Sequence, residues 1–419
     1  MAKFIITGGK KLSGEITTGG AKNNAQIMIP VSLMSEDTIT LHNVPRIDGV
    51  DKSLELLTDL GADIKDQGAT ISINTAKITK TELDKKIADK FRTSIMFVGP
   101  LLARFGRVRF PHPGGCVIGA GGRPIDLFLE GFAALGAQVA VKDGYYEISA
   151  ERLRGGNFFF TTATVTGTQS LIMTACLAEG RTTLQNCAME PEVTALAEYL
   201  NRQGAKISGA GTPTIVIEGV KKISAGDCEI IPDRIEAGSF AILAAATDSA
   251  IKITHCQPAH LGSLLAVFDK IGVKYETGTD WLSIKKSRPL KAYDLKTHEY
   301  PGFSTDLQSP YVVLMTQAQG TALIQETIYD RRLIWTDMLS QMGANIIMCD
   351  PHRVAVSGPA KLYGKKLISP DIRAGIALVI AALIAEGRTE IDNIYQIDRG
   401  YEQLDARLRM LGAVIERTE

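Results

Sequence analysis

The sequence predicts a layered α/β fold built from six copies of one repeated unit. Three observations support this prediction. A phrase related to Leu-Gly-Ala recurs six times, an amphipathic helical stretch precedes each copy, and a stretch of alternating apolar residues follows it. Glycine is expected to end such a helix because it adopts the left-handed backbone conformation at little cost. The recurring glycines lie 68 to 75 residues apart and are Gly61, Gly136, Gly204, Gly272, Gly343 and Gly412.

A second helix is expected to open each unit. These opening segments are apolar nearly all round, which predicts helices buried on most faces. They comprise residues 23–34, 93–103, 168–178, 238–246, 309–318 and 375–385. Each unit should then run as buried helix, strand, amphipathic surface helix and two further strands. Six units of about 70 residues exceed what one hydrophobic core usually serves, so two domains of three units are expected.

Composition favours a soluble cytoplasmic protein without a nucleic-acid or membrane partner. Lys+Arg and Asp+Glu both number 46, so no net field attracts polyanions. No apolar run reaches transmembrane length, and the first residues lack the apolar region of a signal peptide. The six cysteines show no CxxC spacing and the six histidines do not cluster, so neither a zinc site nor a disulfide framework is predicted.

Cys116 differs from the other cysteines in its surroundings. It lies in a stretch rich in glycine and proline between residues 111 and 122, which predicts an exposed loop. His112 and Arg123 flank the thiol and would lower its pKa, so Cys116 could act as a nucleophile or proton donor. An incidental surface cysteine is the alternative. The remaining five are expected to be small core residues: Cys176, Cys187, Cys228, Cys256 and Cys349.

Polar or charged residues stand at the starts of the six buried helices. Helix N-termini carry partial positive charge, and symmetry should gather them in a cleft between two domains, where they would bind an anion such as phosphate. Nearby cations would add charge-assisted contacts. These cations are Lys22, Arg92, Arg123, Arg332, Arg373 and Arg399. Capping alone is the alternative; it explains Ser304 and Thr305 well and the cations poorly.

Six motifs resemble those of the UDP-N-acetylglucosamine 1-carboxyvinyltransferase family, in the same order and at compatible spacing. They are GAKNNA at 20–25, PGGCVIG at 113–119, RPIDL at 123–127, PDRIEAGSF at 232–240, FSTDLQ at 303–308 and DRGYEQLDARLRMLGA at 398–413. The shikimate-pathway enolpyruvyl transferase shares the six-unit fold, but its serine-lysine-serine start and paired-asparagine helix are absent here.

The resemblance implies a two-domain inside-out α/β barrel joined by two crossings of the chain. One domain would hold residues 1–20 and 232–419, and the other residues 21–231 with the Cys116 loop. The implied reaction transfers the enolpyruvyl group of phosphoenolpyruvate to the 3-hydroxyl of UDP-N-acetylglucosamine and releases phosphate. This is the first committed step of peptidoglycan synthesis, in the cytoplasm, and ties the protein to cell-wall biogenesis, cell shape and cell division. No metal or organic cofactor is implied.

The resemblance also implies roles for single residues. Cys116 would protonate the methylene carbon of phosphoenolpyruvate, and Asp306 would accept the proton of the sugar hydroxyl; a helix N-cap is the alternative role for Asp306. The phosphoenolpyruvate contacts would be Lys22, Asn23, Arg123, Arg373 and Arg399, with Lys22 and Arg399 also catalytic. The nucleotide-sugar contacts would be Arg92, Arg123, Pro124, Ile125, Asp126, Leu127, Asp306 and Ile328, with Asp371 and Arg332 in support.

The chain departs from the family pattern in three places. Gly121 and Gly122 are inserted between the cysteine and the arginine, Asp48 stands where a lysine often occurs, and residues 163–167 follow the pattern loosely. Two other functions stay open at this point. One is an enolpyruvyl transferase with a different acceptor, and the other is a non-catalytic paralogue that binds a nucleotide sugar.

Overall fold

The structure, a computed structural model, describes residues 2–114 and 125–418. These residues form two compact units. Unit 1 contains residues 2–19 and 232–418, and unit 2 contains residues 20–114 and 125–231. The chain leaves unit 1 after Gly19 and returns to it at Pro232. The expected boundaries stood after residues 20 and 231; the division into two domains of three units each stays a prediction.

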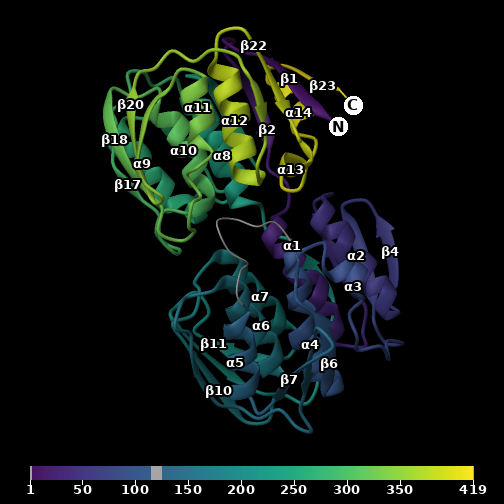
Figure 1. The fold of residues 1–419 in the computed structure, drawn as a ribbon. Helices are drawn as coiled ribbons and strands as arrows, with labels where there is room; N and C mark the ends of the chain where they lie inside the picture. Colours follow the sequence, from purple (N-terminus) through teal and green to yellow (C-terminus); the bar gives the residue numbers. More distant parts are fainter. Residues whose placement is uncertain (1, 115–124, 419) are drawn as a thin grey trace. The chain divides into compact units, whose positions relative to one another are not determined.

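Three helices form the centre of unit 1: α8 (Arg234–Ala246), α10 (Thr305–Met315) and α12 (Ile372–Ile384) pack against one another. Strands of one sheet lie on one side of these helices and strands of another lie on the other side (Figure 1). The described strand orders are β21 (Lys366–Ile368), β22 (Arg388–Asp392), β1 (Lys3–Thr7), β23 (Val414–Thr418); β15 (Tyr275–Thr277), β16 (Trp281–Ile284), β14 (Ala250–Thr254), β2 (Ser13–Thr17); and β17 (Leu295–Lys296), β18 (Gly320–Gln325), β20 (Arg353–Gly358), β19 (Asn345–Asp350).

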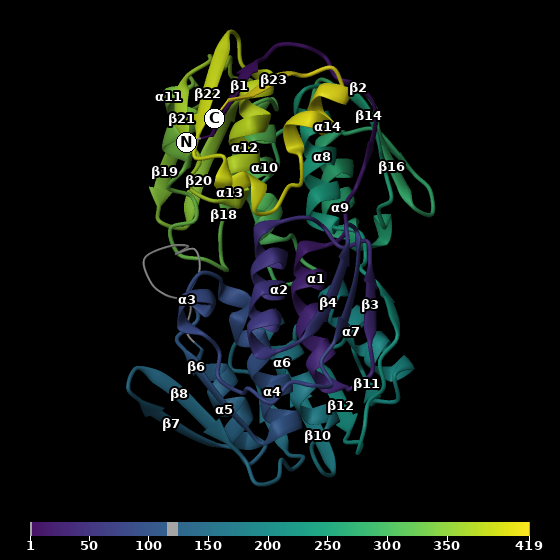
Figure 2. The same cartoon turned by 90° about the vertical axis from the view of Figure 1, so that its right-hand side faces the viewer.

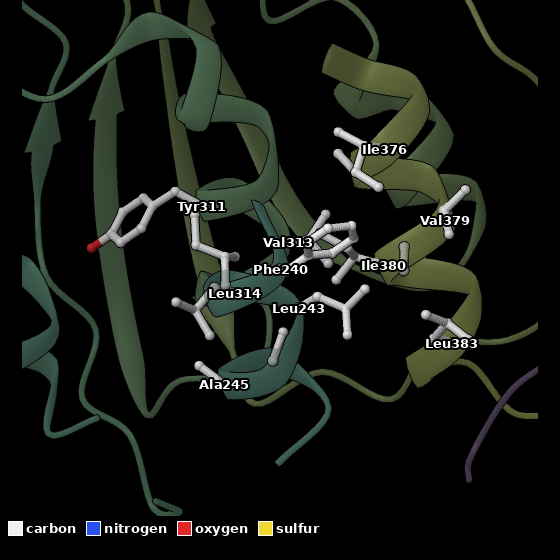
Figure 3. Close-up of a cluster of buried hydrophobic side chains, with 14 of the residues drawn as sticks. Phe240, Leu243, Ala245, Tyr311, Val313, Leu314, Ile376, Val379, Ile380 and Leu383 are labelled. Atoms are coloured by element: carbon white, nitrogen blue, oxygen red, sulfur yellow. The ribbon is translucent and has the colours of Figure 1, made fainter. Parts of the chain in front are cut away.

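The central helices of unit 1 meet through large apolar side chains. Phe240 and Leu243 of α8, Val313 of α10, and Ile376 and Ile380 of α12 lie together and are fully buried (Figure 3). Burying one such side chain contributes about 1.5–3 kcal/mol to stability. The prediction that the opening helices are buried on most faces is confirmed, because 12 of the 13 residues of α8 are buried, those from Ile235 to Ala246.

Unit 2 repeats this arrangement. Its buried helices are α1 (Lys22–Val31), α4 (Val98–Phe105), which continues the 3-10 segment η2 (Arg92–Phe97), and α6 (Val165–Cys176). Its strands lie outside these helices (Figure 2). The described strand orders are β13 (Asp227–Glu229), β3 (Ile39–His42), β5 (Thr70–Asn74), β4 (Asp63–Gln67); β11 (Lys206–Ser208), β12 (Thr214–Glu218), β10 (Arg181–Gln185), β9 (Asn157–Phe159); and β6 (Arg107–Pro111), β8 (Tyr145–Ser149), β7 (Gln138–Lys142).

The six recurring glycines follow the amphipathic helices, and all adopt positive φ, between 87° and 105°. The left-handed ends predicted from the repeated phrase are therefore confirmed. The helices that they follow are α2 (Asp48–Leu60), α5 (Asp126–Ala134), α7 (Pro191–Arg202), α9 (Gly262–Ile271), α11 (Thr336–Gln341) and α14 (Leu404–Met410). The last two are short, six and seven residues.

A parallel strand completes most of the sheets, which the sequence did not predict. β13 pairs with β3, β9 with β10, β2 with β14, β17 with β18, and β21 with β22. The first strand of the chain, β1, lies between β22 and β23, so the two ends of the chain share one sheet (Figure 1). Both units place helices inside and sheets outside, as the inside-out α/β fold requires.

The expectation for Cys349 is wrong. Cys176, Cys187, Cys228 and Cys256 are buried, but Cys349 is exposed. It lies in β19, an edge strand whose register with β20 shifts between Met348 and Asp350. An apolar run such as Ile-Ile-Met-Cys therefore does not face the core throughout, because an edge strand has one open side and the shift turns residues outward.

Candidate functional site

The starts of α8, α10 and α12 lie within reach of one another in unit 1. Arg373, in the first turn of α12, donates to Asp306 in the first turn of α10, with 2.7 Å between Nη2 and Oδ2. Arg373 also contacts the hydroxyl of Tyr401 at 3.5 Å, and that hydroxyl lies 2.9 Å from Ser239 of α8. Three of the six helix starts therefore lie near one another within this unit, and their gathering in a cleft between two domains stays a prediction.

Asp306 is held between two buried guanidinium groups. Nη2 of Arg332 donates to Asp306 Oδ1 at 2.9 Å, on the opposite side from Arg373. The side chains of Arg332 and Arg373 are 3% and 8% exposed, whereas that of Asp306 is 25% exposed. The two arginines are thus screened from water, and the Asp306 side chain between them is partly exposed.

The charges of this group shift its pKa values strongly. Burial alone would raise the pKa of the Asp306 carboxyl, but the positive charges of Arg373 and Arg332 outweigh burial and hold that pKa well below its usual range. Burial lowers and Asp306 raises the pKa of Arg373, and the net direction is upward. Burial raises the pKa of Tyr401 to about 12. Asp306 is therefore an anion and Tyr401 a neutral hydroxyl at neutral pH.

Helix capping does not explain Asp306. The cap of α10 is Ser304, whose hydroxyl accepts from the amide of Asp306 at 3.3 Å. Asp371 does cap α12, because its Oδ1 accepts from the amides of Arg373 and Ala374 at 2.7 and 3.0 Å. The capping alternative is thus wrong for Asp306, and Asp371 has at least a structural role in starting the helix that carries Arg373.

A buried carboxylate links Arg332 to the loop that follows β18. Arg332 Nη1 donates to Thr305 Oγ1 at 2.6 Å, and Thr305 Oγ1 donates to Glu326 Oε2 at 2.8 Å. Glu326 Oε1 accepts from the backbone amide of Ile328 at 2.8 Å. The predicted contact residues Asp306 and Ile328 therefore belong to one hydrogen-bonded network.

Arg399 lies in the same unit, directly after the short helix α13 (Tyr395–Asp398). Its Nη1 donates to Gln396 Oε1 at 3.1 Å, and its guanidinium carbon lies 5.9 Å from the ring centre of Tyr395. Tyr401, which contacts Arg373, follows two residues later. Arg399 is therefore close along the chain to the residues that surround Asp306.

The predicted residues of unit 2 lie at element starts. Lys22 and Asn23 begin α1, and Arg92 begins η2, which packs against α1. Asp126 is exposed and begins α5, preceded by buried Ile125 and followed by half-buried Leu127. Arg46, near Asp48, pairs with Asp66 at 2.8 Å.

Cys116, Arg123 and Pro124 lie outside the described residues, as do the inserted Gly121 and Gly122. Their roles stay predictions. Over residues 2–114 and 125–418, no helix has the length and apolar character needed to span a membrane. Over the same residues, no group of three or more His, Cys, Asp or Glu side chains could hold a metal ion.

Sequence reasoning did not single out Tyr401 or Glu326. Tyr401 lies inside the DRGYEQ motif, so its place in a matched segment was the available signal. Glu326 follows an apolar strand and belongs to none of the quoted motifs. Its burial, 1% exposed, becomes evident only when β17, β18 and α10 are placed together.

Comparison with known proteins agrees with this fold. The family described as EPSP synthase (3-phosphoshikimate 1-carboxyvinyltransferase) matches residues 6–408. The UDP-N-acetylglucosamine 1-carboxyvinyltransferases of Desulfosudis oleivorans and Solibacter usitatus are 42% and 43% identical; the alignments cover 100% of this chain and 99% and 100% of theirs.

Solved structures show the same architecture. The enolpyruvyl transferase NikO from Streptomyces tendae has a TM-score of 0.89 at 24% identity, over 100% of this chain and 99% of its own. EPSP synthase from Acinetobacter baumannii has a TM-score of 0.76 at 16% identity, over 100% of both chains. At these identities the structures support the fold alone. The full-length identity to the curated relatives carries the family: the chain belongs to the UDP-N-acetylglucosamine 1-carboxyvinyltransferase family of enolpyruvyl transferases.

Proposed function

We propose that this protein transfers the enolpyruvyl group of phosphoenolpyruvate to the 3-hydroxyl of UDP-N-acetylglucosamine and releases inorganic phosphate. The full-length likeness to relatives of that name supports the proposal. The structural observation that supports it best is the ionised Asp306 held between Arg332 and Arg373. Such a group can accept a hydrogen bond from a sugar hydroxyl while the cations meet an anionic substrate.

The reaction needs an addition followed by an elimination. In the addition, the sugar 3-oxygen bonds to C2 of phosphoenolpyruvate while C3 gains a proton, which Cys116 would supply. In the elimination, C3 loses a proton and the C2–O bond to phosphate breaks, which restores the double bond. Asp306 would take the proton of the sugar hydroxyl. Neither step changes oxidation state, and neither requires an organic cofactor.

The ion pairs of Asp306 affect its strength as a base. A carboxylate whose pKa is held far below its usual range accepts a proton poorly. The phosphate and carboxylate of phosphoenolpyruvate would bring negative charge to Arg373 and weaken its hold on Asp306. The pKa of Asp306 would then rise, because the nearby positive charge is partly neutralised. Bound phosphoenolpyruvate would thus make Asp306 a better base toward the sugar hydroxyl.

The binding roles divide by residue type. Lys22, Asn23, Arg123, Arg373 and Arg399 would hold phosphoenolpyruvate, since cations and an amide suit its phosphate and carboxylate. The nucleotide sugar would contact Asp306 and Ile328 from unit 1 and a set from unit 2. That set is Arg92, Arg123, Pro124, Ile125, Asp126 and Leu127.

The proposed reaction places the protein at the first committed step of peptidoglycan synthesis in the cytoplasm. Its proposed partners are the two small-molecule substrates. Cell shape and cell division would depend on it through the cell wall.

Replacement of Cys116 tests the proposed acid. A serine hydroxyl is a far weaker acid than a thiol with a pKa of about 8.5, so Cys116→Ser should lose most turnover and keep nucleotide-sugar binding. Inactivation by fosfomycin, an epoxide that mimics phosphoenolpyruvate, should also depend on Cys116. Phosphate release and calorimetric binding of UDP-N-acetylglucosamine would be measured on both proteins. Wild-type turnover in Cys116→Ser would overturn the proton-donor assignment.

A further inference from the structure

Glu326 is a buried carboxylate that the proposed chemistry does not use. It directly follows β18 and is 1% exposed. Oε1 accepts from the amides of Ile328 and Tyr329 at 2.8 and 3.2 Å and from Thr297 Oγ1 at 3.2 Å. Oε2 accepts from Thr305 Oγ1 at 2.8 Å. One side chain therefore joins three regions: the end of β17, the start of α10 and the loop after β18.

Two backbone amides and two hydroxyls donate to Glu326, so hydrogen bonds satisfy its buried carboxylate oxygens. Thr305 links Glu326 to a cation. Arg332 Nη1 donates to the Thr305 hydroxyl at 2.6 Å, so Thr305 acts as acceptor toward Arg332 and must direct its single proton to Glu326. The same guanidinium uses Nη2 for Asp306.

We propose that Glu326 is a positioning residue for the nucleotide-sugar site. Through Oε2 it fixes the direction of the Thr305 proton, which leaves a Thr305 lone pair for Arg332 and holds that guanidinium against Asp306. Through Oε1 it fixes the backbone at Ile328. This inference rests on the proposed function, in which Asp306 and Ile328 contact the nucleotide sugar.

Glu326→Gln separates the contact with Thr305 from the contact with the backbone at Ile328. The amide oxygen of glutamine can still accept from the amides of Ile328 and Tyr329, so the loop keeps its anchor. The NH2 group then faces Thr305, which receives a second donor besides Arg332 and loses the acceptor for its own proton. Arg332 should therefore shift relative to Asp306.

The expected kinetic effect follows from losing one hydrogen bond to a charged group. For Glu326→Gln, kcat/KM for UDP-N-acetylglucosamine should fall about 10- to 100-fold. The mutation should change KM for phosphoenolpyruvate by less than about threefold. Glu326 would act through Thr305 and Arg332 on Asp306, which is proposed to contact the nucleotide sugar.

A double-mutant cycle with Thr305→Val shows whether Glu326 acts through Thr305. Thr305→Val should lower kcat/KM by a similar factor. Because both replacements break one path, the double variant should be no more than about threefold below the lower single variant. Effects that multiply would show that Glu326 and Thr305 act independently and would overturn the proposal.

Tyr311→Phe is the matched control. Tyr311 is fully buried on α10, the helix that also carries Thr305 and Asp306. Its hydroxyl donates to the carbonyl of Tyr293 at 2.8 Å and does not contact Asp306, Arg332 or Glu326. This variant should melt at a lower temperature yet keep kcat/KM within about twofold of wild type.

The outcomes distinguish this inference from the proposed function. Absence of wild-type turnover with UDP-N-acetylglucosamine would overturn the proposed function, and the inference with it. Wild-type turnover with unchanged kcat/KM in Glu326→Gln would overturn the inference alone. If Glu326→Gln does not fold, Thr305→Val decides, and turnover at the wild-type level in that variant would overturn the inference.

Discussion

Asp306→Asn changes the charge of the site while keeping its volume. The asparagine oxygen can accept from one guanidinium, but its NH2 group then faces the other as donor against donor. Two arginine side chains, 3% and 8% exposed, lose their shared anion. The variant should therefore lose stability as well as activity.

The stability loss can be worked from burial. Removing one partner of a buried ion pair costs about 3–5 kcal/mol, and we take about 3 because the Asp306 side chain is a quarter exposed. For a cooperative unit of 150–250 residues, each kcal/mol lowers the melting temperature by about 2–4 °C. Asp306→Asn should thus melt about 6–12 °C below wild type. A helix-cap role alone would predict a much smaller change, since asparagine caps as well as aspartate.

The assay combines thermal unfolding with phosphate release at 25 °C, where both proteins are folded. Turnover at saturating substrates should fall on the order of 10²-fold or more, because the proposed proton acceptor is gone. Asp350→Asn is the control. Its partner Arg353 is 49% exposed, so breaking that solvated pair should leave both the melting temperature and turnover nearly unchanged.

Two results would refute this reasoning separately. A melting temperature within about 2 °C of wild type would mean that the buried arginines do not depend on Asp306. Normal turnover in a folded Asp306→Asn would mean that another group accepts the sugar proton.

Three further predictions concern single groups. Tyr401→Phe removes the hydroxyl between Arg373 and Ser239. In steady-state kinetics, kcat/KM for phosphoenolpyruvate should therefore fall about 5- to 10-fold. An unchanged value would show that the Tyr401 hydroxyl does not position Arg373. Asp306 has a lower pKa folded than unfolded, so it adds stability above about pH 4 that is lost as pH falls further. Urea unfolding should therefore show the gap between wild type and Asp306→Asn narrowing below pH 4, and a constant gap would contradict the pKa shift. Gly204→Ala places a Cβ in open space, but at φ 100° an alanine backbone is strained. The variant should therefore lose about 1–2 kcal/mol of stability and melt at a lower temperature. An unchanged melting temperature would contradict this backbone cost.

The repeats could be predicted from sequence because their signals are local. A glycine that ends a helix, an apolar helix and a short turn each depend on a few adjacent residues. Gly61 and Gly412 therefore showed the same unit at opposite ends of the chain, and both have positive φ. Two of the parallel strands that complete the sheets were missed because their partners are distant: β2 pairs with β14, 237 positions further along the chain, and β13 pairs with β3, 187 positions earlier.

The site was predictable only in part for the same reason. Arg373 was identified from its place at a helix start and Asp306 through the family resemblance, but nothing local indicates that they form an ion pair across 67 positions. Glu326 could not be predicted at all, because a lone acid after a strand is usually solvated. Cys349 was placed wrongly because apolar neighbours do not show that a strand lies at a sheet edge.

The most direct test of the central claim is phosphate release from phosphoenolpyruvate with three acceptors supplied separately: UDP-N-acetylglucosamine, UDP-glucose and shikimate 3-phosphate. The proposed function predicts rapid phosphate release with UDP-N-acetylglucosamine and an enolpyruvyl ether at its 3-oxygen, detected by mass spectrometry. The other two acceptors should give little release. Preferential turnover of either, or no turnover with any of the three, would contradict it.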